Sequence, residues 1–237
     1  MTKGASTGFI IISMLGLACI PVRQKQSPIL RYEHNFDIVN NLFWAPSGHT
    51  FDNHLAEFSD ENLKIEDNAL NLYLKESGKG QRFFKAAEIR TRRTFKYGKF
   101  VARLMAAKGS GVISSFFLYD TWGKKNQEID IEFTGKNPSS ITFNNWIDGK
   151  SNSKSIDLPF DATEGFHEYA ITWKKNEIIW EADGKELYRT RENVPTQQMS
   201  LMANIWPSKS NDWAGKLNPE ILPQKMIIDY IKIYSIK

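Results

Sequence analysis

Hydrophobic and polar residues alternate along most of the chain from about residue 30 onward. Leu70, Leu72 and Leu74 are separated by single residues, and the same period of two recurs in residues 100–104 and 227–233. Such a period places apolar side chains on one face of a strand and polar side chains on the other. No stretch keeps the 3.6-residue apolar period of a helix. The pattern therefore predicts many short, half-buried strands.

Two Asp-Gly pairs mark the turns between predicted strands. Asp148-Gly149 follows the β-forming run 143–146, and Asp183-Gly184 separates two further β-forming runs. A two-residue type I′ turn needs positive φ at both positions, which Asp-Gly tolerates well. Strands about ten residues apart, joined by such turns and without an internal repeat, predict an all-β sandwich or barrel.

The length of 237 residues suits one large all-β domain. Hydrophobic residues make up 41% of the chain and charged residues 24%, as in ordinary globular proteins. Aromatic residues reach 13% and include 7 Trp. Aromatic side chains fill cores, but Trp side chains also stack on the flat faces of sugars. Composition thus allows a carbohydrate site without requiring one.

The formal net charge of +4 is small for a chain of this length. Its densest basic cluster is Arg-Thr-Arg-Arg at residues 90–93. A single basic cluster is common on protein surfaces, so we interpret it as a solvated strand end rather than a nucleic-acid site. No nucleic-acid partner is expected.

The N-terminus has the pattern of an export signal. Lys3 precedes an apolar run over residues 9–18, which is too short to span a bilayer, and Gly16 and Ala18 suit a cleavage site. Residues 19–30 are polar with two prolines. We therefore expect a secreted or cell-envelope protein with a signal peptide over 1–18, a linker over 19–30 and a domain over 31–237.

Cys19 is the only cysteine, so the chain cannot form an intramolecular disulfide. It stands where bacterial lipoproteins carry an acylated cysteine, although Gly16 occupies a position that normally holds Leu, Val or Ile. Two interpretations stay open: a lipid anchor at Cys19, or a cysteine that merely follows the cleavage point.

The segment 127–133 carries the strongest candidate chemistry. Residues i, i+2 and i+4 of a strand share a face, so Glu128, Asp130 and Glu132 project together while the intervening isoleucines point to the core. Like charges this close raise one another's pKa, so one carboxyl can keep its proton while another is ionised. Glycoside hydrolysis needs that division. The alternatives are a solvated acidic face or a Ca²⁺ site.

The surroundings of this segment resemble glycoside hydrolase family 16, whose catalytic strand reads Glu-x-Asp-x-Glu. The resemblance covers roughly residues 33–236. It includes Glu-Ile-Arg at 88–90, Tyr-Gly-Lys-Phe at 97–100, Tyr-Ala-Ile-Thr-Trp at 169–173, Met-Ala-Asn-Ile-Trp at 202–206 and Asn-Asp-Trp-Ala-Gly at 211–215. It implies a β-jelly-roll sandwich of two antiparallel sheets with a concave substrate cleft.

The resemblance also implies roles for individual residues. Glu128 would be the nucleophile, Asp130 the assisting carboxylate and Glu132 the general acid/base of a retaining mechanism without a catalytic cofactor. Many members hold a structural Ca²⁺, for which Asp229 is the candidate ligand here. The residues expected to contact substrate are Glu88, Arg90, Trp122, Asn144, Trp146, Asn204, Trp206 and Trp213.

Several of these residues have a simpler interpretation. Trp122 and Trp213 could equally pack in the core, and Glu88 with Arg90 could be a surface ion pair of small effect. Trp206 lies two residues from Asn204 on the same strand face, which favours the cleft. His49, His54 and His167 show no metal-ligand spacing, so we interpret them as structural.

The spacing of the motif narrows the substrate within the family. The five-residue form without an inserted residue is typical of bacterial β-1,3-1,4-glucanases (lichenases) and of xyloglucan-active enzymes. The six-residue form, whose insertion bulges the strand, is typical of β-1,3-glucanases. We therefore expect a monomeric lichenase-like hydrolase acting on β-glucan.

Other functions stay open at this point. They are a transglycosylase, a β-1,3-glucanase, and a catalytically silent carbohydrate-binding domain. The chain departs from bacterial lichenases in lacking a disulfide, and residues 44–58 align poorly with them.

Overall fold

A computed structural model gives the fold of residues 1, 27–50, 55–78, 82–121 and 126–236. Strands dominate this part of the chain, and helices are limited to α1 (Asn211–Ala214) and two 3₁₀ turns, Asp60–Asn62 and Pro219–Ile221. The strands are β1 (Ile29–His34), β2 (Trp44–Pro46), β3 (Ala56–Phe58), β4 (Leu63–Glu66), β5 (Ala69–Glu76), β6 (Phe84–Phe95), β7 (Gly98–Met105), β8 (Val112–Tyr119), β9 (Gln127–Thr134), β10 (Ser140–Ile147), β11 (Lys150–Asp157), β12 (His167–Trp173), β13 (Ile178–Ala182), β14 (Lys185–Thr190), β15 (Met199–Pro207) and β16 (Gln224–Ser235).

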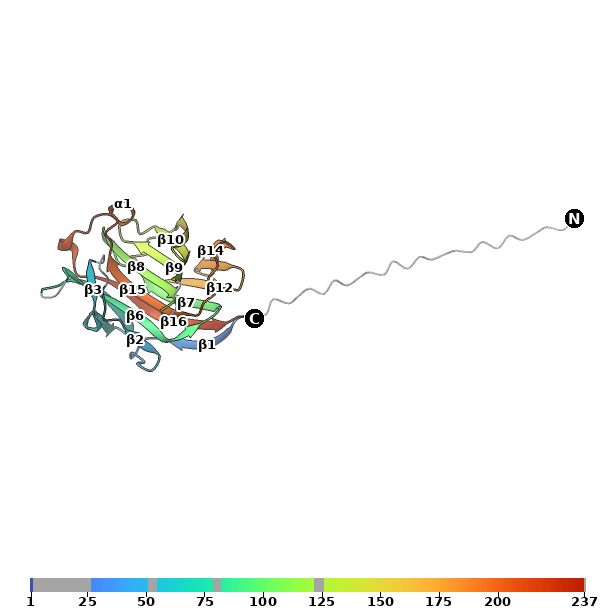
Figure 1. The fold of residues 1–237 in the computed structure, drawn as a ribbon, viewed down its shortest axis with the longest axis horizontal. Coiled ribbons are helices and arrows are strands. Elements are labelled where there is room, and N and C mark those ends of the chain that lie inside the picture. Colours follow the sequence, from blue (N-terminus) through green and yellow to red (C-terminus); the bar gives the residue numbers. More distant parts are fainter. Residues whose placement is uncertain (2–26, 51–54, 79–81, 122–125, 237) are drawn as a thin grey trace.

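The strands form two layers that are joined along one edge (Figure 1). One layer has the order β11-β10-β9-β8-β15-β6, and the other has the order β5-β16-β7-β12-β13-β14. A short antiparallel pairing of β5 with β6 links the layers, so the whole is a strongly curved, nearly closed sandwich. The predicted all-β jelly-roll class is confirmed.

Both predicted Asp-Gly turns are present as hairpin turns. Asp148 and Gly149 have φ of 51° and 80° and join β10 to β11, while Asp183 and Gly184 have φ of 46° and 75° and join β13 to β14. Positive φ at both positions is the type I′ geometry, whose twist matches that of the flanking strands. The sequence signal therefore located two sheet connections correctly.

The core lies between the two layers and is filled by the apolar positions of the alternating pattern. Ile129 and Ile131 of β9 are fully buried, and they face a second layer that contributes the buried Tyr169, Trp173 and Trp180. Trp44 is fully buried in the same core. Removing so many aromatic and β-branched side chains from water is the main favourable contribution to folding.

The last two long strands of the chain occupy central positions. β15 pairs with both β8 and β6, and β16 pairs with both β5 and β7. The strand that joins the two halves of each layer therefore comes from residues 199–235.

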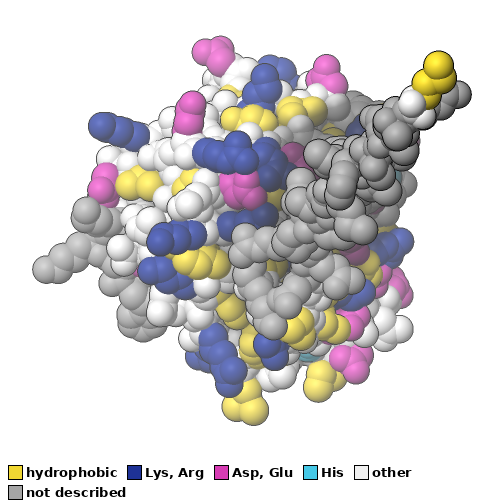
Figure 2. All heavy atoms as spheres, turned by 90° about the vertical axis from the view of Figure 1, so that its right-hand side faces the viewer, with side chains coloured by type: hydrophobic (Ala, Val, Ile, Leu, Met, Phe, Trp, Pro, Cys, Tyr) yellow, Lys and Arg dark blue, Asp and Glu magenta, His cyan; other side chains and the backbone are white. Residues whose placement is uncertain are grey.

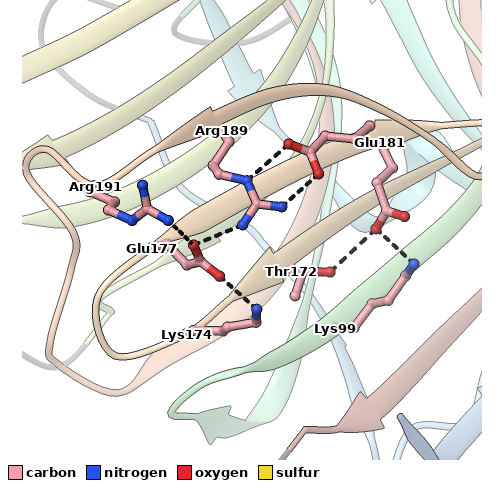
Figure 3. Close-up of polar contacts among 8 residues, drawn as sticks. Lys99, Thr172, Lys174, Glu177, Glu181, Arg189 and Arg191 are labelled. Carbon is pink, nitrogen blue, oxygen red and sulfur yellow. Dashed lines mark hydrogen bonds and ion pairs between the residues drawn. The ribbon is translucent and has the colours of Figure 1, made fainter. Parts of the chain in front are cut away.

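An ion-pair network braces the far edge of the second layer (Figure 3). Glu177 accepts hydrogen bonds from Lys174, Arg189 and Arg191 at 2.6, 2.8 and 3.2 Å. Hydrogen bonds and charges from these partners lower the pKa of Glu177 to about 2. Beside it, Glu181 pairs with Lys99 at 2.7 Å. The network ties β14 to the β12–β13 hairpin.

The domain begins slightly earlier than predicted, because β1 starts at Ile29. The predicted signal peptide and Cys19 lie outside the described residues, so both stay predictions. Within the part of the chain that the structure describes, no helix is long and apolar enough to cross a membrane.

Candidate active site

Strand β9 presents its three carboxylates in an unbroken register. It pairs with β10 from Glu132 opposite Thr142 to Gln127 opposite Ile147, and with β8 along its other edge, without a bulge in either ladder. Its side chains therefore alternate strictly, and Glu128, Asp130 and Glu132 project from the face of the sheet opposite the core. The structure thus brings together the three residues that the sequence singled out.

Cross-strand pairing arranges the side chains of this face in three rows. Each carboxylate of β9 belongs to one row, and each row continues through residues opposite one another on β10, β8, β15 and β6. The first row is Thr142, Glu132, Ser115, Asn204 and Glu88; the second is Asn144, Asp130, Phe117, Met202 and Arg90; the third is Trp146, Glu128, Tyr119, Ser200 and Thr94.

These rows form the floor of an open cleft of about 710 Å³. The segment after β2 forms one wall. The cleft is lined by Pro46, Ser47, Gly48, His49, Phe58, Glu88, Arg90, Ser115, Phe117, Tyr119, Thr121, Glu128, Asp130, Glu132, Met202, Asn204 and Trp206. A concave site of this size with converging polar groups suits a chain of sugar rings.

Glu128 and Asp130 share a hydrogen bond in which Asp130 is the donor. Burial raises the pKa of Glu128 to about 7, the hydrogen bond from Asp130 lowers it, and the charge of Glu88 raises it. Burial and the charges of Glu128 and Glu132 hold the pKa of Asp130 well above its ordinary value. Asp130 therefore keeps its proton and stabilises the ionised form of Glu128.

The pKa of Glu132 is also shifted toward neutral pH. Burial and the charge of Glu128 raise the pKa of Glu132 to about 7, while a hydrogen bond from Asn144 lowers it. That bond runs from Nδ2 of Asn144 to Oε2 of Glu132 at 2.8 Å. A carboxyl group whose pKa lies near 7 can give up a proton and take one back at neutral pH.

Glu88 and Asn204 form a buried pair beside the catalytic strand. Nδ2 of Asn204 donates to Oε2 of Glu88 at 3.0 Å, while Oε1 of Glu88 and Oδ1 of Asn204 are buried without a hydrogen-bond partner. Unpaired buried acceptors are costly, so they are well placed to receive sugar hydroxyls. Arg90 lines the same cleft one row away.

Three of the four predicted tryptophans lie in the described part of the chain. Trp206 lines the cleft, and its indole N–H donates to the Ser115 hydroxyl at 3.2 Å. Trp213 lies behind it, with ring centroids 6.2 Å apart. Trp146 is half-buried opposite Glu128 on β10. Trp122 lies outside the described residues, so its role stays a prediction.

Asp229 lies in the other layer, on β16, away from the cleft. Its carboxylate is paired with the guanidinium of Arg103. Among the described residues, no group of three metal-ligating side chains is present. The structural Ca²⁺ at Asp229 stays a prediction.

Sequence reasoning missed part of the cleft floor. Ser115, Phe117 and Tyr119 of β8 lie directly opposite the three carboxylates. The signal was available, because Ser115, Phe117 and Tyr119 follow the same period of two as the carboxylates. His49 was interpreted as structural but lines the cleft.

The catalytic strand is held from behind by the second layer. The indole N–H of the fully buried Trp180 crosses the core and donates to the backbone carbonyl of Asp130 at 3.0 Å. Trp180 also stacks on Phe143 of β10, with ring centroids 5.4 Å apart. It is therefore a positioning residue for the carboxylates, although it does not reach the cleft.

Replacing Trp180 with Phe is expected to lower kcat about tenfold with little change in KM, because small misplacements of reacting groups are costly. The matched control is Trp173→Phe, since Trp173 is equally buried but donates to the carbonyl of Pro195 at 3.0 Å. Both variants should lose similar stability by thermal melting. Equal losses of kcat in the two variants would contradict a positioning role for Trp180.

A β-sandwich with three closely spaced carboxylates on the floor of an open cleft has the groups that glycoside hydrolysis needs. The sequence matches the family described as "Glycosyl hydrolases family 16" over residues 51–232. This chain belongs to glycosyl hydrolase family 16, as the resemblance implied.

Known proteins of similar sequence and structure carry related names. A beta-glucanase of Brevibacillus brevis is 31% identical over 209 residues, which is 85% of this chain and 80% of that protein. A β-1,3-1,4-glucanase (lichenase) from a mouse hindgut metagenome superposes with a TM-score of 0.83 at 31% identity, covering 87% of this chain and 99% of that one. The Bacillus licheniformis beta-glucanase superposes with a TM-score of 0.82 at 28% identity over 90% of this chain and 100% of that one.

Proposed function

We propose that this enzyme is a retaining endo-β-1,3-1,4-glucanase in which Glu128 is the nucleophile and Glu132 the general acid/base. The observation that carries the proposal is the unbroken register of β9, which places both carboxyls on the cleft floor with Asp130 between them. Glu128 and Glu132 project from the same face of one strand into the same cleft, as two carboxyls that act on one bond must.

In the first step, the ionised Glu128 attacks the anomeric carbon of the sugar bound beside it. The glycosidic C–O bond breaks as Glu132 gives its proton to the leaving oxygen, and a covalent glycosyl ester forms on Glu128. Asp130 holds Glu128 in its ionised form until attack by donating a hydrogen bond. Asn144 then stabilises the carboxylate that Glu132 becomes.

In the second step, water replaces the departed sugar chain. Glu132, now ionised, removes a proton from the water as its oxygen attacks the anomeric carbon, and the ester bond to Glu128 breaks. Two inversions at the same carbon restore the β configuration. The enzyme is returned with Glu132 protonated and Glu128 ionised, so protons and charge balance over the cycle.

The choice of β-1,3-1,4-glucan rests on two supports. The catalytic strand has no inserted residue, and its ladder with β8 and β10 has no bulge that would re-aim Glu132. Relatives that cover most of this chain are named beta-glucanase or lichenase.

Product analysis on a panel of polysaccharides tests the proposal. Barley β-glucan and lichenan should be cut rapidly with release of new reducing ends, and laminarin, xyloglucan and agarose much more slowly. Proton NMR of the first products should show the β-anomer before mutarotation. Preferred cleavage of laminarin would assign a β-1,3-glucanase, and redistribution of polymer lengths without a net gain of reducing ends would assign a transglycosylase.

A further inference from the structure

Exposed hydrophobic side chains gather where the chain enters the domain. Five large hydrophobic residues between 27 and 236 are exposed in the described part of the chain. Four of them fall within residues 29–42: Ile29, Leu30, Ile38 at 68% exposure and Leu42 at 90%. The fifth, Phe83, lies at the opposite end of β6 from this group. A gathering of this kind marks a contact surface more than single exposed residues do.

The loop that carries Ile38 and Leu42 is held in place by its neighbours. His34 hydrogen-bonds the carbonyl of Ile38 at 2.8 Å, and the backbone N–H of Leu42 donates to the Asn40 side chain at 3.1 Å. Tyr32 of β1 stacks on Phe43 with ring centroids 3.6 Å apart. The two apolar side chains are therefore presented to solvent by a fixed loop.

Arg92 of β6 contacts this loop, and Arg93 follows it in the strand. The guanidinium of Arg92 donates to the carbonyl of Asn41 at 2.8 Å, and Arg92 and Arg93 are both exposed and line one shallow depression. The acidic residue of the loop, Asp37, accepts the backbone N–H of Ile38 at 3.0 Å. We name Ile38, Leu42, Arg92 and Arg93 the basal patch.

The segment that precedes the domain bears on what covers this patch. The face at which β1 begins shows many Lys and Arg side chains, with hydrophobic side chains along its lower edge (Figure 2). About ten residues separate Cys19 and the apolar run 9–18 from Ile29. Ten extended residues span at most about 33–36 Å, so a chain held at a bilayer by this segment keeps the patch within reach of the lipid surface.

We propose that the basal patch docks on the anionic headgroup surface of a phospholipid bilayer. Ile38 and Leu42 enter the interface between headgroups and acyl chains, and Arg92 and Arg93 pair with lipid phosphates. None of the four residues lines the cleft, so the contact is separate from substrate binding and does not rest on the proposed activity.

A fluorescent probe at a single position tests this contact. Because Cys19 is the only cysteine, Cys19→Ser in the full chain provides a background for labelling Leu42→Cys with a polarity-sensitive fluorophore. Phe83→Cys is the matched control, since Phe83 is 83% exposed at the other end of β6. Thermal melting checks that each labelled protein is folded.

On vesicles of phosphatidylglycerol and phosphatidylcholine in equal parts, the probe at position 42 should shift to shorter wavelength and the probe at position 83 should not. Pure phosphatidylcholine should give a weaker shift. Adding Arg92→Gln and Arg93→Gln should weaken the response to anionic vesicles about tenfold at low salt.

Two results would overturn the proposal. One is an equal response at positions 42 and 83. The other is the absence of a wavelength shift at position 42. This result would count against the proposal even if the protein co-sedimented with the vesicles, because the N-terminal segment alone would then hold it there.

Discussion

Glu128→Gln is expected to reduce kcat on lichenan about 10⁴-fold or more while the protein stays folded, because no covalent intermediate can form without the carboxylate. Burial and the charge of Glu88 raise the pKa of Glu128 to about 7, so its ionised form costs folding free energy. That cost grows as pH rises from the unfolded pKa near 4.5 toward 7. Removing the charge should therefore leave the melting temperature at pH 8 unchanged or higher.

Chemical rescue identifies the role of Glu128 directly. In Glu128→Ala, azide can occupy the space of the missing carboxylate and attack the anomeric carbon from the same side. A substrate with an activated leaving group should then yield an α-glycosyl azide, opposite in configuration to the normal product. Glu181→Gln is a suitable control, because Glu181 pairs with Lys99 in the other layer. Full activity in Glu128→Ala would contradict the assignment of Glu128 as the nucleophile.

Glu132→Gln is expected to give the complementary pattern. Polymeric substrates should be cut at least 10²-fold more slowly, because their leaving oxygen needs a proton. Aryl glycosides with good leaving groups need none, so they should still form the glycosyl ester rapidly and then accumulate it. Azide should resolve that ester to a β-glycosyl azide, the anomer opposite to the one from Glu128→Ala.

The pH dependence of kcat/KM supplies a second readout for Glu132. Burial and the charge of Glu128 raise its pKa to about 7, so wild-type activity should fall as pH rises through 7 and the acid loses its proton. This alkaline limb should disappear in Glu132→Gln, whereas Asn144→Ala should move it upward, because the hydrogen bond from Asn144 lowers the pKa of Glu132. An alkaline limb that persists unchanged in Glu132→Gln would assign it to another group.

The alternation along the chain was sufficient to predict the site's central strand. Glu128, Asp130 and Glu132 could be placed on one face because a strand has a strict period of two, and Asp183-Gly184 could be placed in a turn because few residue pairs tolerate its geometry. These predictions depend on local conformation alone.

The contacts that the sequence did not reveal join residues that are distant in the sequence and become neighbours only in the fold. Asn204 donates to Glu88 from 116 positions away, and Trp180 reaches the Asp130 carbonyl of the other layer from 50 positions away. Asp229 illustrates the same limit, because its partner Arg103 is 126 positions away. Local patterns carry no information on such long-range contacts.

The placement of β15 and β16 has a consequence for synthesis of the protein. Each layer receives a central strand only when the last forty or so residues are available: β15 between β8 and β6, and β16 between β5 and β7. Until then β6 and β8, which both contribute to the cleft floor, lack the strand that joins them, and they expose unpaired edges. A nascent chain whose residues 199–235 have not yet emerged from the ribosome therefore has neither a closed core nor a cleft.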